Sequence, residues 1–171
     1  MKLSVILITW NSGKDVVPCL NSVLESTNHL DRELIVVDNG SSDDTLKKLN
    51  RYSGELQIYR NTKNRGVAKA RNKAIKKARG NYIWILDIDT LVNRKAVDEM
   101  IRNLEENPDV GLCGCKLTSL HGNVQDSCRQ IPSVRFKFFN ALLAVDDKFG
   151  FISPFRKRIG RLIKISITTL S

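Results

Sequence analysis

The sequence has few of the residues that build zinc sites or disulfide frameworks. It contains two histidines and four cysteines among 171 residues. Cys113 and Cys115 form a C-x-C pair with no second pair and no histidine cluster nearby, which is a poor zinc signature. We therefore expect all four cysteines to be reduced, mostly buried small apolar residues: Cys19, Cys113, Cys115 and Cys128. His29 and His121 stand alone, and we expect each on the surface or in a loop.

Long hydrophobic runs are also missing. No apolar run reaches the length needed to span a membrane. The run Leu3–Trp10 is too short for a signal peptide, and acidic and turn residues follow it closely. Because 42% of the residues are hydrophobic and 27% are charged, we expect a folded globular chain. A cytoplasmic location is the default expectation.

Glycine-rich phosphate-binding motifs are a third absence. The segment Asn11–Asp15 holds one glycine where a dinucleotide-binding fingerprint needs G-x-G-x-x-G, and the sequence contains no P-loop motif. This argues against a dinucleotide-binding site after the first apolar segment.

Strand-like and helix-like patterns of apolar residues alternate along the chain. Short runs rich in β-branched residues predict buried strands. They are Leu3–Trp10, Glu33–Val37, Glu55–Tyr59, Tyr82–Leu86 and Val110–Leu117. Helical patterns lie between them, and the alternation predicts an α/β fold with a mostly parallel sheet flanked by helices, Rossmann-like in its nucleotide-binding half.

Capping residues mark the expected helix ends. The first helix is capped by Ser12 or Asp15, and Asn93 caps the last. The second passes through Leu46 and Leu49, with Ser41, Ser42 and Asp43 as possible caps. Gly66 opens the third and Gly80 ends it as a C′ glycine. The expected inward residues of this third helix are Val67, Ala70, Ala74, Ile75 and Ala78.

Polar residues stand at three of the predicted strand ends. Thr9 and Asn11 follow the first strand, Asp38 the second, and Asp87 and Asp89 the fourth. Ligands of such sheets bind beyond the carboxyl ends of the strands, so we expect these residues in one crevice. Carboxylate oxygens suit Mg²⁺ or Mn²⁺. The alternative is that both late aspartates are loop or capping residues.

Asp38 and Arg71 complete the candidate site. Asp38 is placed to accept hydrogen bonds from a nucleotide base or ribose, although Asn39-Gly40 also fits a plain turn. Arg71 lies near a glycine-opened helix start, which suits a phosphate-bearing ligand. A solvated helix face is the better account of Lys73, Lys76, Lys77 and Arg79. Together the candidates describe a site for a nucleoside diphosphate with a metal.

Four ordered motifs resemble the inverting glycosyltransferases of family two, which have the GT-A fold. They are Val5–Asn11, Glu33–Thr45, Asn64–Asn72 and Gly80–Asp89. The resemblance implies that Thr9, Asn11 and Asp38 line the base and ribose site. It implies Arg71 near the base or diphosphate, Asp87 near the ribose or metal, and Asp89 as a metal ligand.

The chain departs from that family pattern in three places. Asp38-Asn-Gly-Ser resembles the rhamnosyltransferase-like branch, whereas Ala70-Arg-Asn72 resembles the commoner branch, so the sugar stays open between hexose and rhamnose. Thr90 replaces an acidic residue of many members. No Glu follows Glu106, so the Glu-Asp pair that supplies the family's base is missing. The remaining base candidates are Asp109, Asp126, Asp146 and Asp147.

The implied activity is metal-dependent transfer of a sugar from a nucleotide diphosphate-sugar to a saccharide or lipid-linked acceptor, as in polysaccharide biosynthesis. We expect residues 1–117 to bind the donor and residues 118–171 to begin an acceptor region that is incomplete, so that transfer is poor. The alternatives are a nucleotidyltransferase and a non-catalytic binding fragment. The net charge of +10 suggests nucleic-acid binding as a further alternative, but no nucleic-acid-binding motif supports it.

A basic amphipathic segment lies near the end of the sequence. Phe155–Lys164 interleaves apolar residues with cations. Such a helix can lie on the anionic inner face of a membrane, where a lipid-linked acceptor would be found. The alternative is that its apolar residues pack against another part of the protein.

Overall fold

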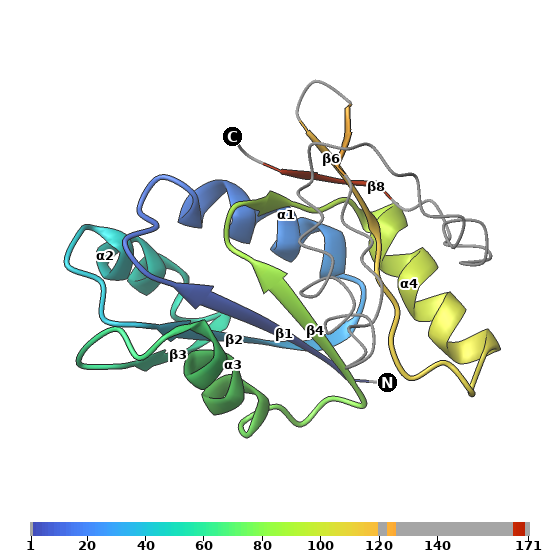
Figure 1. The fold of residues 1–171 in the computed structure, drawn as a ribbon, viewed down its shortest axis with the longest axis horizontal. Coiled ribbons are helices and arrows are strands. Elements are labelled where there is room, and N and C mark those ends of the chain that lie inside the picture. Colours follow the sequence, from blue (N-terminus) through green and yellow to red (C-terminus); the bar gives the residue numbers. More distant parts are fainter. Residues whose placement is uncertain (1, 120–122, 126–165, 170–171) are drawn as a thin grey trace, which may run out of the picture.

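Four parallel strands form the central sheet of the computed structural model, which describes residues 2–119, 123–125 and 166–169. The strands are β1 (Lys2–Thr9), β2 (Asp31–Asp38), β3 (Leu56–Arg60) and β4 (Tyr82–Asp87). Their order across the sheet is β3-β2-β1-β4 (Figure 1). The predicted parallel α/β sheet is confirmed, because each predicted strand up to Leu86 forms within a few residues of its expected bounds.

Helices cover both faces of this sheet. They are α1 (Val16–Thr27), α2 (Thr45–Leu49), α3 (Val67–Ile75) and α4 (Arg94–Glu106), with a short 3-10 turn η1 (Asn50–Tyr52) after α2. Apolar residues of α1, α2 and α4 pack in one cluster with Leu3, Val5 and Leu7. Helix α3 packs on the opposite face over β1 and β2.

Strand alternation explains why both faces are apolar. Successive side chains of β1 point to opposite faces, so Val5 and Leu7 face α1 while Ile6 faces α3. All three are fully buried, as expected for a parallel strand between two helical layers.

The start of α3 agrees with the sequence, but two details were predicted wrongly. Gly66 is the N-cap residue with φ +80°, and Ala70 and Ala74 are fully buried. Val67 was expected inward, yet it is 52% exposed and lies outside the cluster that Ala70 and Ala74 form with the sheet. Gly80 was expected as the C′ glycine, but α3 ends at Ile75 with Lys76 as its cap. The amide of Gly80 instead donates to Ser4 Oγ at 2.8 Å.

Strand β4 is exposed on one of its two faces. Register pairing places Ile85 beside Ile6, on the face where α3 packs mainly over β1 and β2. Ile83 and Ile85 are consequently 46% and 44% exposed. The expectation that β4 is fully buried is therefore wrong for one face of the strand.

The predicted strand Val110–Leu117 forms only at its end. The observed strand is β6 (Lys116–Ser119), and within the described ranges it pairs with β7 (Val124–Gln125) and β8 (Ser166–Thr169) instead of with β4. Strand β8 also pairs with β5 (Thr90–Leu91). Residues 110–115 border an open cleft beside β4. Gly111 and Gly114 have no side chain to pack on a pleated surface, which weakens a strand there.

The predictions for single residues outside the sheet have mixed outcomes. Asn93 caps α4 as expected, accepting from the amide of Ala96 at 2.8 Å. His29 is exposed and pairs with Asp98 at 2.8 Å. Cys19, Cys113 and Cys115 are free thiols; the first is buried and the other two are half-buried. His121, Cys128 and the basic segment Phe155–Lys164 lie outside the described residues.

The buried thiol of Cys19 generates a prediction about alkaline stability. Burial raises its pKa from 9.0 to about 12. Between these values the unfolded chain loses the thiol proton while the folded chain keeps it, so folding becomes less favourable as pH rises. We expect the free energy of unfolding to fall by up to about 1.4 kcal/mol per pH unit above pH 9 through this group.

Chemical denaturation of the unaltered chain and of Cys19→Ala at pH 8, 9 and 10 measures this contribution. The difference between the two chains is expected to shrink as pH rises. A difference that stays constant across the series would contradict the assignment.

Candidate functional site

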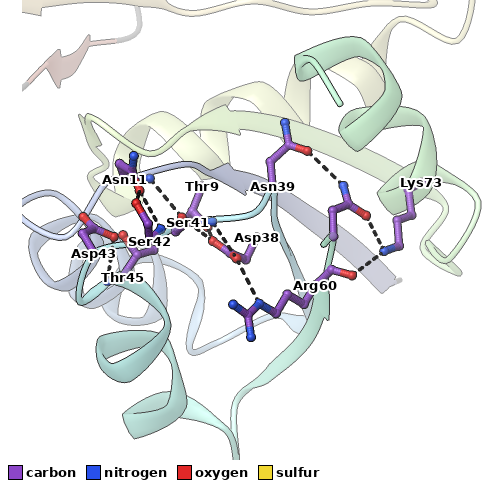
Figure 2. Close-up of polar contacts among 11 residues, drawn as sticks. Thr9, Asn11, Asp38, Asn39, Ser41, Ser42, Asp43, Thr45, Arg60 and Lys73 are labelled. Atoms are coloured by element: carbon purple, nitrogen blue, oxygen red, sulfur yellow. Dashed lines mark hydrogen bonds and ion pairs between the residues drawn. The ribbon is translucent and has the colours of Figure 1, made fainter. Parts of the chain in front are cut away.

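A buried carboxylate lies at the point where three strands end. The strand register places Thr9, Asp38 and Arg60 in one row across β1, β2 and β3. Thr9 Oγ1 donates to Asp38 Oδ1 at 3.2 Å, and the amide of Ser41 donates to Asp38 Oδ2 at 3.2 Å. The hydroxyl of Ser41 also donates to Oδ1. Figure 2 shows these contacts converging on Asp38.

Arg60 completes the environment of this carboxylate. Its Nε lies 3.9 Å from Asp38 Oδ2, and its side chain is 63% exposed while that of Asp38 is 0% exposed. A carboxylate without exposed surface touches a ligand only if a neighbour moves. Arg60 is the neighbour best placed to move, because its contact is long and its side chain is largely in solvent.

The loop after β1 is fastened to the loop after β2. Asn11 has a positive φ of 50°, and its amide donates to Ser41 Oγ at 2.9 Å. Its side-chain Oδ1 accepts from the amide of Ser42 at 2.9 Å. The amide of Ser12 donates to Thr45 Oγ1 at 2.9 Å. Asn11 therefore lies between the two loops, and its side-chain oxygen Oδ1 connects them.

The carboxylate of Asp43 also connects these two loops through hydrogen bonds. Its carboxylate accepts from the amide of Gly13 at 3.1 Å and from the amide of Thr45 at 3.1 Å. A hydrogen bond from the Thr45 side chain is the main cause that lowers the pKa of Asp43 below its usual value. Asp43 thus holds the first turn of α2, as expected, although the N-cap position itself is Asp44, whose side chain makes no capping bond.

The loop between β3 and α3 meets the turn after β2 through asparagine side chains. Asn39 is 2% exposed. Its Oδ1 accepts from Asn61 Nδ2 at 3.0 Å and from the amide of Arg65 at 3.1 Å. Lys73 on α3 in turn donates to Asn61 Oδ1 at 2.7 Å. Figure 2 shows Asn39 and Lys73 on either side of this connection.

Arg71 and Asp87 form an ion pair across the site. The guanidinium lies on α3 and the carboxylate at the end of β4, and their side chains are 34% and 69% exposed. The Nε atom of Arg71 is buried and has no hydrogen-bond partner within the described part of the chain. The sequence expectation that these two residues share one site agrees with this geometry.

Asp89 follows two residues later and is also exposed. Its carboxylate makes no hydrogen bond or ion pair to any residue that the structure describes. Within these residues no group of three or more His, Cys, Asp or Glu could hold a metal ion. Two exposed carboxylates do fit a cation such as Mg²⁺, which is commonly held by one or two carboxylates with substrate phosphates and water.

Several residues of this site were not predicted from the sequence. Arg60, Asn39 and Asn61 were missed, and Ser41 was expected only as a helix cap. The available signal was position, because each follows a strand that ends at the same edge of the sheet. The roles of Thr9, Asn11, Asp38, Arg71, Asp87 and Asp89 toward a ligand stay predictions.

Comparison with known families gives the chain its classification. The sequence profile of Glycosyl transferase family 2 matches residues 4–160, which is most of the chain. The chain belongs to this family. The described fold agrees, since its parallel sheet with flanking helices matches the GT-A fold of a solved relative.

Two relatives of this family member are named for poly(ribitol-phosphate). The chain is 28% identical over 180 residues to the poly(ribitol-phosphate) β-N-acetylglucosaminyltransferase TarP of Staphylococcus aureus, covering 99% of this chain and 53% of TarP. It is 32% identical to a poly(ribitol-phosphate) β-glucosyltransferase of Bacillus spizizenii, covering 88% of this chain and 24% of that enzyme.

A solved structure supports the same relationship. Staphylococcus aureus TarS in complex with UDP-GlcNAc superposes with a TM-score of 0.62 at 29% identity, covering 80% of this chain and 38% of that one. The chain thus spans about half of TarP and less than half of the other two relatives.

The buried Asp38 carboxylate yields a stability prediction at Thr9. Thr9→Val removes one hydroxyl donor while keeping a β-branched shape. We expect a loss of about 1–3 kcal/mol in the free energy of unfolding, because a buried charged acceptor loses a partner. Urea denaturation measures the loss.

Thr27→Val is the matched control. Thr27 is equally buried, but its hydroxyl donates to the carbonyl of Val23 inside α1, a neutral acceptor. The loss at Thr9 is expected to exceed that at Thr27. Equal losses would show that the Asp38 charge is not what makes the Thr9 hydroxyl important.

Proposed function

We propose that this chain forms the donor-binding part of an inverting, metal-dependent glycosyltransferase that uses a UDP-sugar. The observation that carries the proposal is the Arg71–Asp87 pair beside the exposed Asp89, at the same sheet edge as Asp38. Family membership supports the reaction class. The named relatives support UDP-N-acetylglucosamine as the first donor to test, because TarS was solved with it.

Each site residue has a proposed role. Thr9, Asn11 and Asp38 line the base and ribose, with Asp38 becoming accessible when Arg60 turns aside. Arg71 binds the diphosphate once the nucleotide replaces its partner Asp87. The exposure of both members of that pair supports such an exchange, since exposed ion pairs contribute little to stability.

A divalent cation, Mg²⁺ or Mn²⁺, would be held by Asp89 together with Asp87. When bound, it would neutralise charge on the diphosphate. The chain's own contribution is the Arg71 guanidinium, which stabilises negative charge as the diphosphate departs.

The reaction proposed for the whole protein is a single displacement. An acceptor hydroxyl oxygen forms a bond to the anomeric carbon from the face opposite the diphosphate. The bond from that carbon to the diphosphate oxygen breaks, and its electron pair leaves with UDP. A carboxylate base takes the hydroxyl proton. We assign no base, because the carboxylates gathered at this site are assigned to nucleotide and metal binding.

The acceptor is proposed to be a saccharide or a lipid-linked polymer. Poly(ribitol-phosphate), named for the relatives, is the acceptor to test first. We propose a location on the inner face of the membrane, where a lipid-linked acceptor would be found. In the described residues no helix is long and apolar enough to cross a membrane.

Isothermal titration with UDP tests the proposed site. We expect the unaltered chain to bind UDP more tightly with Mn²⁺ than with EDTA. Asp89→Ala is expected to remove the metal effect, because it deletes the exposed carboxylate that we propose as a metal ligand. A loss of about tenfold or more in metal-dependent affinity is expected for removing a charged ligand contact.

Asp31→Ala is the control for charge. Asp31 is an exposed aspartate at the start of β2, at the opposite edge of the sheet. It should leave the UDP affinity and its metal dependence unchanged. Absence of UDP binding in the unaltered chain would refute the function, whereas binding that ignores Mn²⁺ would refute only the metal assignment.

A further inference from the structure

The segment from β3 through most of β4 carries charge of one sign only. Residues 56–86 contain no Asp or Glu but nine cationic residues. They are Arg60, Lys63, Arg65, Lys69, Arg71, Lys73, Lys76, Lys77 and Arg79. Helix α3 lies within this segment, on the face of the sheet opposite α1, α2 and α4 (Figure 1). Side chains of α3 that point away from the sheet therefore face solvent.

Carboxylates from neighbouring strands pair with only part of this segment. Three arginines have such a partner: Arg60, Arg71 and Arg79. Four other cationic residues are exposed, and no carboxylate within the described ranges pairs with their charged groups. They are Lys63, Arg65, Lys69 and Lys76. Much of the positive charge around α3 is therefore balanced only by solvent ions.

Helix α4 shows how the same chain builds a solvated face of mixed charge. Arg94 Nε lies 3.6 Å from Asp98 Oδ2 one turn later. Arg102 pairs with both Glu99 and Glu106. Opposite charges at these spacings stabilise an exposed helix slightly. A helix face that only needs to be soluble can thus alternate its charges.

Helix α3 does the reverse. Lys69 and Lys73 are four residues apart, and Lys76 follows three residues later. Like charges at these spacings destabilise a helix. The first turn also has no acidic residue, although the helix dipole would favour one there. The expected solvated face explains why these lysines are exposed, but a bound anionic partner explains why no acid lies between them.

The shape of this surface indicates the kind of anion. An open groove is lined by Lys69, Asn72, Lys73, Lys76 and Lys77. Residues three or four apart on a helix have Cβ atoms about 5–6 Å apart, so the cations form a row along α3. A row of cations is complementary to a chain whose phosphates recur at regular intervals.

A membrane surface fits α3 less well. A helix that lies on a membrane exposes large apolar residues beside its cations. Val67, at the start of α3, is the one large apolar residue that this helix exposes. Ile75 is half-buried against the sheet, in the same cluster as the buried Ala70 and Ala74.

We propose that the groove on α3 binds the phosphates of a phosphodiester polymer. The inference rests on the proposed function for the identity of this polymer as the acceptor, with poly(ribitol-phosphate) as the form to test. A long acceptor can contact the groove through repeats remote from the one that reacts. Each contact is an ion pair between a lysine ammonium group and a phosphate, so binding releases counterions and weakens as salt rises.

Lys69→Gln/Lys76→Gln tests the groove, and Lys47→Gln/Lys95→Gln is the matched control. Each double variant removes two exposed lysines for which the described residues provide no ion pair, so the net charge falls equally. Lys47 lies on α2 and Lys95 on α4, which pack on the other face of the sheet. Thermal unfolding verifies that each variant is folded, and titration with UDP reports on the donor site.

Fluorescence anisotropy with labelled oligo(ribitol phosphate) measures polymer binding at several salt concentrations. We expect Lys69→Gln/Lys76→Gln to weaken binding about fivefold, as two exposed ion pairs are lost. The dependence of log affinity on log salt should become shallower by about 1.4, from about 0.7 for each lost contact with a single strand. The control variant should match the unaltered chain, and both variants should bind UDP normally.

The other outcomes separate this proposal from the proposed function. Equal weakening by both variants, or weakening by neither, would overturn the groove as the binding surface. Binding to anionic phospholipid vesicles but not to the oligomer would assign the surface to a membrane and overturn the proposal. If the unaltered chain binds UDP but not the oligomer, only this inference fails. If it binds the oligomer through the groove but binds no UDP, the proposed function fails and the polymer surface is supported.

Discussion

The burial of the Asp38 carboxylate is the constraint on which the site depends. A buried charge is costly unless donors surround it. Thr9 comes from β1 and Ser41 from the turn after β2, so satisfying one carboxylate fixes the end of β1 against that turn. The amide of Asn61 donates to the Asp38 carbonyl oxygen at 2.8 Å and joins the end of β3 to the same point. The parallel register puts them within reach. The amide of Asn39 continues the ladder to Thr9 O at 2.8 Å.

From this edge the loops are held mostly by uncharged polar side chains, with the Asp43 carboxylate as a charged contact between the first two loops. Asn11 joins the loop after β1 to the turn after β2, and Asn39 joins that turn to the loop before α3. A second ion pair joins Arg71 of α3 to Asp87 at the end of β4. The Arg71–Asp87 ion pair thus lies beside loops that are held in place by directional hydrogen bonds. Such a support suits a site that must hold a flexible diphosphate in one position.

The sequence predicted the parts of this structure that depend on periodicity. Buried β-branched runs predicted β1 to β4, and their ends predicted the residues that gather at one edge. Predictions failed where the outcome depends on neighbours. Val67 is apolar but 52% exposed, and Ile85 is 44% exposed because α3 packs mainly over β1 and β2. Residues 110–115 were predicted to be part of a strand but have no strand partner among the described residues.

The network around Asn39 could not be predicted for a related reason. Asn39-Gly40 is an ordinary turn pair in sequence, and only the approach of Lys63 in space shows that it is buried. The positive φ values of Asn11 and Gly66 are likewise seen only in the structure. Family motifs indicate which side chains gather here, whereas the hydrogen-bond directions come from the structure alone.

The central claim is that the carboxyl edge of β1, β2 and β4, with the start of α3, binds a nucleoside diphosphate. Mapping amide chemical-shift changes on addition of UDP and Mg²⁺ tests it most directly. The account predicts changes at Thr9–Asn11, Asp38–Ser41 and Gly66–Arg71. Changes confined to the cleft beside β4, at Tyr82–Ile85 and residues 110–115, would contradict it.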